Sequence, residues 1–223
     1  MLRIVVAVTA LLAASGAHAQ VSGNVTWTSD YRFRGVSLSD NAPALQLSLA
    51  YDATGGWYGG ALVSSVREPL GADANAQLVT YAGYARRVRG SLSWEVGAEY
   101  AMLLGASEYD YPEFYVGLAS ERLSGRLYYA PHYFDEGAII YAEINGTQPL
   151  SKRLRLLAHV GWLRPGQGDD ADDERTRFDA LAGLGIALSG FDLRIAWVEA
   201  GGNEPEYRGD GDGGWTLTLS RSW

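Results

Sequence analysis

The stretch VSGNVTWTSDYRFR, residues 21–34, decides the fold class. One set of alternate positions is apolar or aromatic: Val21, Val25, Trp27, Tyr31 and Phe33. The other set is polar or charged: Ser22, Asn24, Thr26, Thr28, Asp30, Arg32 and Arg34. Successive side chains of a strand point to opposite faces, so the pattern predicts one strand with a dry face and a wet face. It is longer than the usual strand of about five or six residues in a soluble protein.

The same period of two recurs along the whole chain. Clear segments lie at 45–52, 92–100, 114–118, 154–162, 178–186, 191–197 and 215–223. Less regular segments lie at 57–66, 76–86, 123–134 and 138–145. With the first segment these make about twelve strands, an even number as in single-chain outer-membrane barrels. We therefore predict an all-β fold, a transmembrane antiparallel up-and-down β-barrel.

The connections between these segments fall into two classes. Tight turns are expected at 53–55, 88–90, 122–125, 149–151 and 189–190, and longer polar links at 35–42, 67–75, 104–112, 164–176 and 199–214. The link at 135–137 is short and breaks the alternation. Alternating short and long connections are typical of periplasmic turns and extracellular loops, so both termini are expected on the periplasmic side.

Aromatic residues on the dry faces fall at two heights. Near the loop ends we expect Tyr31, Phe33, Tyr100, Phe114, Trp162, Phe178, Trp197 and Trp215. Near the turn ends we expect Tyr51, Trp57, Phe191 and Trp223. Two belts of rings around an aliphatic band are typical of the two membrane interfaces, and a soluble β-sandwich would not produce them.

Composition removes several classes of function. The chain of 223 residues carries a net charge of −8, which argues against a nucleic-acid partner. It has no cysteine, so disulfides, thiol nucleophiles and zinc–thiolate sites are absent. No cofactor and no metal site is expected.

The N-terminus indicates export. Arg3, an apolar run over 4–14 and the triplet Ala17-His18-Ala19 predict a signal peptide at 1–19, which leaves residues 20–223 as the barrel. We therefore expect a bacterial outer-membrane protein. Its expected partners are outer-membrane lipids, lipopolysaccharide, small hydrophilic solutes and the outer-membrane assembly machinery.

Three stretches resemble a known family. The motif S-D-Y-R-F-R-G-x-S at 29–37, the segment N-x-P-A-x-Q at 41–46 and the end WTLTLSRSW at 215–223 are similar to the TorF-family porins of proteobacteria. An aromatic final residue on an alternating strand also resembles the signal that the assembly machinery reads, although Arg221 departs from that signal. The resemblance implies an outer-membrane location and a pore, and it supplies no substrate.

The wet faces carry charges of both signs. The residues predicted to line a pore are Asp30, Arg32, Arg34, Glu95, Glu99, Arg126, Glu143, Arg155, Asp179 and Arg194, with Glu113, His132 and His159 on the same side. Such a wall favours passive diffusion of small hydrophilic solutes through a narrow charged lumen. The same charges would also suit a self-neutralised wall in a closed, structural or adhesive barrel. Whether a loop folds inward and narrows the pore stays open.

Two further functions are weaker. A barrel lipid hydrolase needs a nucleophile, a base and an orienting group, and no Gly-x-Ser-x-Gly motif is present, so no catalytic residue is predicted. The acidic stretches at 168–174 and 209–214 do not match a calcium-binding loop, but divalent cations could bridge them to lipopolysaccharide phosphates.

Overall fold

A computed structural model describes residues 20–67, 69, 72–134, 137–165, 176–202 and 213–223. The predicted signal peptide lies outside the described residues, as do the acidic stretch at 168–174 and most of the one at 209–214.

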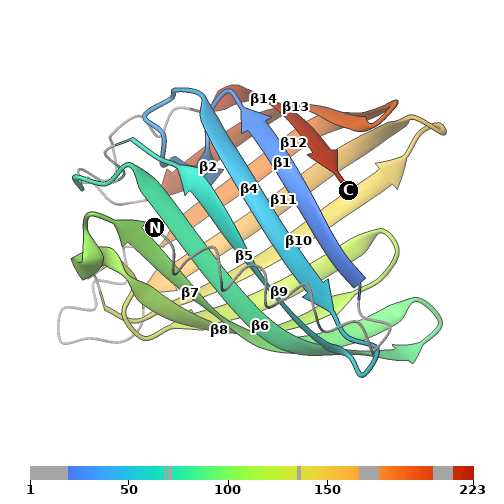
Figure 1. The fold of residues 1–223 in the computed structure, drawn as a ribbon, viewed down its shortest axis with the longest axis horizontal. Coiled ribbons are helices and arrows are strands. Elements are labelled where there is room, and N and C mark those ends of the chain that lie inside the picture. Colours follow the sequence, from blue (N-terminus) through green and yellow to red (C-terminus); the bar gives the residue numbers. More distant parts are fainter. Residues whose placement is uncertain (1–19, 68, 70–71, 135–136, 166–175, 203–212) are drawn as a thin grey trace, which may run out of the picture.

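Twelve antiparallel strands form a closed barrel, which confirms the predicted fold class (Figure 1). The strands are β1 (Gln20–Thr28), β4 (Ala44–Asp52), β5 (Trp57–Ser65), β6 (Ala76–Arg89), β7 (Leu92–Leu104), β8 (Tyr111–Ala119), β9 (Leu123–Ala130), β10 (Ile139–Pro149), β11 (Leu154–Pro165), β12 (Arg177–Leu188), β13 (Phe191–Gly202) and β14 (Gly214–Ser222). Each pairs with its neighbours in sequence, and β1 pairs with both β4 and β14. Closure leaves no sheet edge unpaired, as a membrane-spanning sheet requires.

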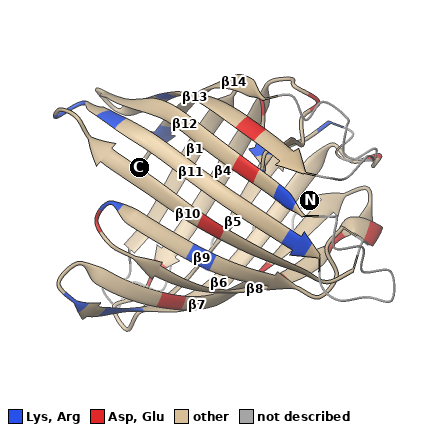
Figure 2. Cartoon of the chain, turned by 180° about the vertical axis from the view of Figure 1, so that it is seen from behind, with Lys and Arg blue, Asp and Glu red and all other residues tan. Residues whose placement is uncertain are grey.

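The outer surface of the barrel is apolar. Every barrel strand has at least one exposed leucine, valine or isoleucine side chain, and the ribbon of the wall carries few charged residues (Figure 2). Ten of the twelve predicted belt residues are exposed there: Tyr51, Trp57, Tyr100, Phe114, Trp162, Phe178, Phe191, Trp197, Trp215 and Trp223. Among the residues that the structure describes, no helix is long and apolar enough to cross a membrane.

Short turns and long links alternate around the barrel (Figure 1). The expected exception at 135–137 is wrong, because β9 ends at Ala130 and β10 begins only at Ile139. The link is therefore long, and the alternation is regular. Aromatic residues at 133 and 134 continue the alternation of apolar and polar residues beyond the end of β9, so the sequence makes this strand look longer than it is.

The first strand is much shorter than predicted. β1 ends at Thr28, and the chain then turns inward to form a two-stranded hairpin of β2 (Arg32–Phe33) and β3 (Val36–Ser37). The expectation that Tyr31 and Phe33 face lipid is therefore wrong. Both rings pack against a buried apolar cluster inside the barrel.

The buried apolar cluster fills the loop end of the barrel interior. It combines residues of the wall with residues of the links: Leu38, Val66, Ala72, Ala74, Ala101, Leu103, Ala106, Tyr111, Tyr115, Tyr128, Ala130, Tyr133, Phe134, Ile139, Tyr141 and Leu163. A short 3-10 helix, η2 (Ser107–Tyr109), follows β7. The interior is thus a packed core at one end, and this core positions the hairpin.

Candidate functional site

The inward-folded hairpin, defined here as residues 29–43, is shaped by two tight turns. Arg34 and Gly35 both have positive φ, at 50° and 80°, between the paired residues Phe33 and Val36. Asp40 and Asn41 also have positive φ, at 53° and 52°, and the Ala42 amide donates to the Ser39 carbonyl. Positive φ at both central residues is the geometry of the type I′ turn, which joins adjacent antiparallel strands. The chain therefore reverses its direction twice within this hairpin.

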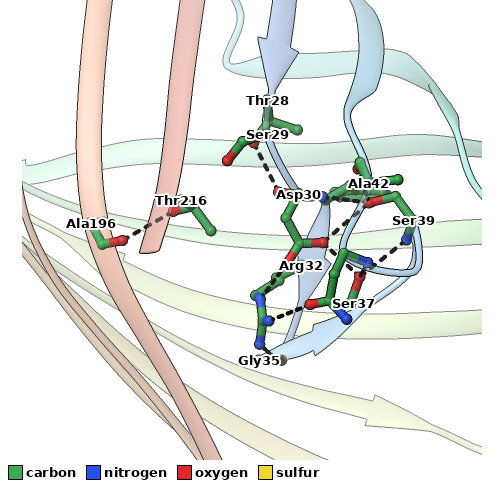
Figure 3. Close-up of polar contacts among 12 residues, drawn as sticks. Thr28, Ser29, Asp30, Arg32, Gly35, Ser37, Ser39, Ala42, Ala196 and Thr216 are labelled. Carbon is green, nitrogen blue, oxygen red and sulfur yellow. Dashed lines mark hydrogen bonds and ion pairs between the residues drawn. The ribbon is translucent and has the colours of Figure 1, made fainter. Parts of the chain in front are cut away.

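Asp30 organises the hairpin from within (Figure 3). Its carboxylate accepts hydrogen bonds from the hydroxyls of Ser37, at 2.6 Å, and Ser39, at 3.1 Å. It also pairs with Nε of Arg32 at 2.5 Å. Arg32 in turn donates to the Gly35 carbonyl and to the Asn41 side chain. The alternation of charge in this stretch therefore serves contacts within the hairpin, and the hairpin carries its own polar network into the lumen.

Arg34 anchors the tip of the hairpin to the wall. Its Nη2 lies 2.8 Å from both carboxylate oxygens of Glu113 on β8, and both side chains are buried. The guanidinium carbon lies 4.1 Å from the centre of the Tyr141 ring, and the ring centres of Phe33, Tyr133 and Tyr128 lie 4.8, 5.2 and 5.3 Å from it. A buried, paired and stacked arginine of this kind is held in one position.

Further contacts carry the hairpin across the whole bore. The Tyr31 hydroxyl donates to Gln77 on β6 at 2.8 Å, and burial raises the pKa of this phenol, so it stays a neutral donor. The Leu38 carbonyl accepts from the Arg67 amide after β5. On the other side, the Gly35 backbone lies against the side chains of Ala200 and Asp179. The hairpin therefore contacts walls from β6 through β10 to β12 and β13.

A chamber lies between the hairpin and the turn end of the barrel. Its volume is about 610 Å³. The hairpin closes one end of the chamber with Tyr31, Arg32, Phe33 and Arg34. Strands around the barrel form its wall, which includes Tyr81, Glu99, Glu143, His159, Asp179 and Arg194. This is the volume of a small-molecule site.

The predicted lining residues fall into four groups. Asp30, Arg32 and Arg34 sit on the hairpin and not on a strand wall, because β1 has already ended. Glu95 and Arg126 form a wall pair at 2.6 Å, with the Tyr58 hydroxyl on the same carboxylate. Arg155 and Arg194 share Asp192 near the turn end, at 2.7 and 2.8 Å.

The fourth group holds the remaining carboxylates. Glu99 lies directly opposite Glu113 in the pairing of β7 and β8. Glu143 accepts from the Tyr128 hydroxyl at 3.4 Å. Asp179 contacts His159, at 2.7 Å, and the Tyr141 hydroxyl, at 3.1 Å. His132, expected on the lumen side, is exposed in the link after β9.

The tyrosines of the interior were not predicted. Tyr58, Tyr81, Tyr128 and Tyr141 point inward and supply ring faces and hydroxyl groups to the pairs described above. Their strands mix apolar side chains on both faces, which blurs the period of two. They could have been found by pairing each strand with its neighbour, because directly opposed residues of two strands point to the same face of the sheet.

Comparisons with known proteins agree with this geometry at the level of fold. The KdgM porin matches with a TM-score of 0.59 and 11% identity, covering 91% of this chain and 99% of that chain. The NanC porin matches with a TM-score of 0.60 and 10% identity, covering 91% and 99%. The COG4313 outer membrane channel from Pseudomonas putida F1 matches with a TM-score of 0.54 and 11% identity, covering 94% of this chain and 97% of that chain. At such low identity the likeness shows a shared barrel fold. No curated protein matches the sequence.

One family model matches nearly the whole chain, over residues 12–223, and its description is "Bacterial protein of unknown function (Gcw_chp)". The match does not test the resemblance to TorF-family porins, which stays a prediction. The chain, a closed twelve-stranded barrel with a hairpin folded into its lumen, belongs to the Gcw_chp family.

Proposed function

We propose that this protein is a bacterial outer-membrane channel for small hydrophilic solutes, in which the inward-folded hairpin is the constriction. The observation that carries the proposal is the hairpin's reach across the bore, from Gln77 to Glu113 and Ala200, above a chamber of about 610 Å³. A solute that enters the chamber can leave at the loop end only past this hairpin. The predicted pore-lining residues would then contact solute on the hairpin, in the chamber and near its turn-end mouth.

Porin-like neighbours support a channel over a purely structural barrel. Proteins with this fold and nearly the same length are described as porins and as an outer membrane channel. The hairpin is also fixed inside the barrel by the buried Arg34–Glu113 ion pair, by the Tyr31–Gln77 hydrogen bond and by packing against the buried apolar cluster, as a permanent constriction would require.

Solute uptake into proteoliposomes tests this proposal. Liposomes with the wild-type protein should swell in small sugars faster than protein-free liposomes, and the rate should fall as solute size grows. Arg34→Ala, which removes the anchor, should admit larger solutes. Arg153→Ala, on an exposed turn, is the matched control and should behave as wild type.

Uptake equal to that of protein-free liposomes, for every solute and for both variants, would contradict the proposal. The closed structural or adhesive barrel would then be the better account.

A further inference from the structure

The charges of the chamber point to a class of solute. Three arginines line it among the described residues: Arg32, Arg34 and Arg194. Each is bound to a carboxylate, respectively Asp30, Glu113 and Asp192. An arginine neutralised at contact distance attracts a second anion only weakly.

The chamber's carboxylates are partnered differently. Glu143 has the Tyr128 hydroxyl as its hydrogen-bond donor, and Arg126, opposite it across β9 and β10, is already bound to Glu95. Asp179 is bound by the Tyr141 hydroxyl and the His159 ring. Glu99 lines the chamber directly opposite Glu113, the partner of Arg34, so two carboxyl groups lie beside one guanidinium. The chamber wall thus carries three carboxyl groups, on Glu99, Glu143 and Asp179, in addition to the three carboxylates that are bound to its arginines.

The opposite sign gathers farther toward the turn end. At the turn end of the chamber, Arg194 of its lining and the neighbouring Arg155 share the single carboxylate of Asp192, which leaves an excess of positive charge there. The lumen is thus polarised along its axis, with its negative part in the deeper chamber. A cation in the chamber would be stabilised by the carboxylates and hydroxyl oxygens of its wall.

We infer that the chamber selects small cationic solutes, of the organic ammonium class, over anionic ones. This inference rests on the proposed channel function and names its substrate class. It separates this chain from the fold neighbour described as "KdgM porin in complex with disordered oligogalacturonate", whose ligand is a polyanion. The chamber's volume suits a solute of a few carbon atoms with its hydration water.

Reversal potentials in planar bilayers under a tenfold KCl gradient test the sign of the selectivity. The wild-type channel should prefer K⁺ to Cl⁻, and Glu143→Gln with Asp179→Asn should lower that preference by about threefold or more. Glu121→Gln removes one carboxylate on an exposed turn and should leave the preference unchanged. A channel that conducts but prefers Cl⁻ would overturn this inference and leave the proposed function standing. So would a preference for K⁺ that is unchanged when Glu143→Gln and Asp179→Asn are introduced.

Calorimetry on the folded protein in detergent gives a second readout that does not need conduction. Putrescine, a dication, should bind more tightly than galacturonate, and Glu143→Gln with Asp179→Asn should weaken putrescine binding about fivefold or more. Tighter binding of galacturonate, or putrescine binding that the chamber variants do not weaken, would contradict the inference. If the protein binds neither probe and also fails to conduct, both the channel and its selectivity are refuted.

Discussion

Arg34 is the residue on which the hairpin's position depends most. It combines a left-handed backbone, an ion pair to the fully buried Glu113 and a shell of four aromatic rings. Removing one partner of a buried ion pair leaves the other charge without compensation, at a cost of about 3–5 kcal/mol. Replacing both partners with apolar residues avoids that cost.

Arg34→Ala should therefore lower the free energy of unfolding by about 3–5 kcal/mol, measured by urea titration in detergent micelles. Arg34→Leu with Glu113→Leu should recover most of that loss, because the buried Glu113 carboxylate is removed together with the cation that neutralises it. If the double variant is as unstable as Arg34→Ala, aromatic stacking and not the ion pair holds the hairpin.

Gly35 is the second residue that the hairpin cannot exchange freely. Its φ is +80°, and an added Cβ would meet the side chains of Ala200 and Asp179. Gly35→Ala should cost about 1–3 kcal/mol from backbone strain and crowding. Gly90→Ala, at an open turn with a φ of +57°, shares the strain without the crowding and should cost less. Equal losses in urea titrations would show that Gly35 is not pressed against the wall.

At the residue scale, the sequence indicated on which side of the barrel wall these charged residues lie, but not which element carries them. Asp30, Arg32 and Arg34 were expected on the wet face of a strand, and they are in the interior, but on a hairpin. The period of two continues across the Thr28 boundary, so hydrophobic patterning could not detect the change. Two consecutive positive-φ residues at Arg34–Gly35 are a backbone property, and arginine carries no strong preference for that conformation.

The hairpin is an element added to the barrel and not part of its wall. Thr28 at the end of β1 pairs with Ala44 at the start of β4, so the barrel wall is continuous without residues 29–43. An Asn-Gly turn is the preferred two-residue connection between such strands. Substitution of residues 29–43 by Asn-Gly should therefore leave the barrel closed.

Circular dichroism and gel mobility without boiling check this expectation. The replaced protein should keep the β-sheet spectrum and the compact mobility of the folded wild type. Loss of both would show that the hairpin is needed to assemble the wall, and would contradict its description as an added element.

Strand number and connectivity could be predicted from the sequence because a membrane-spanning barrel constrains both. Outward side chains must be apolar and inward ones polar, so alternation is visible in most strands, and loop length follows from sidedness. The exceptions are at the loop end, around Phe134 and Phe33, where aromatic residues pack inside the barrel and not against lipid. An interior core overrides the simple rule of polar inside and apolar outside.

For the molecule as a whole, the outer surface should behave as a membrane band with a depth profile. Val160 on β11 is exposed at mid-strand, and Leu123 is exposed where β9 leaves its turn. Val160→Arg should cost about 2–4 kcal/mol in folding into lipid vesicles, and Leu123→Arg about 0–1 kcal/mol. Equal costs, measured by urea titration in vesicles, would contradict the placement of the band.

If the hairpin at 29–43 is the constriction, it sets the conductance of this barrel. Single-channel recording in planar bilayers tests it directly, with wild-type protein compared against the variant in which Asn-Gly replaces residues 29–43. We expect small or rare conductance steps in the wild type and larger, persistent steps in the variant. Steps of the same size and frequency in both proteins would show that the constriction does not lie at the hairpin.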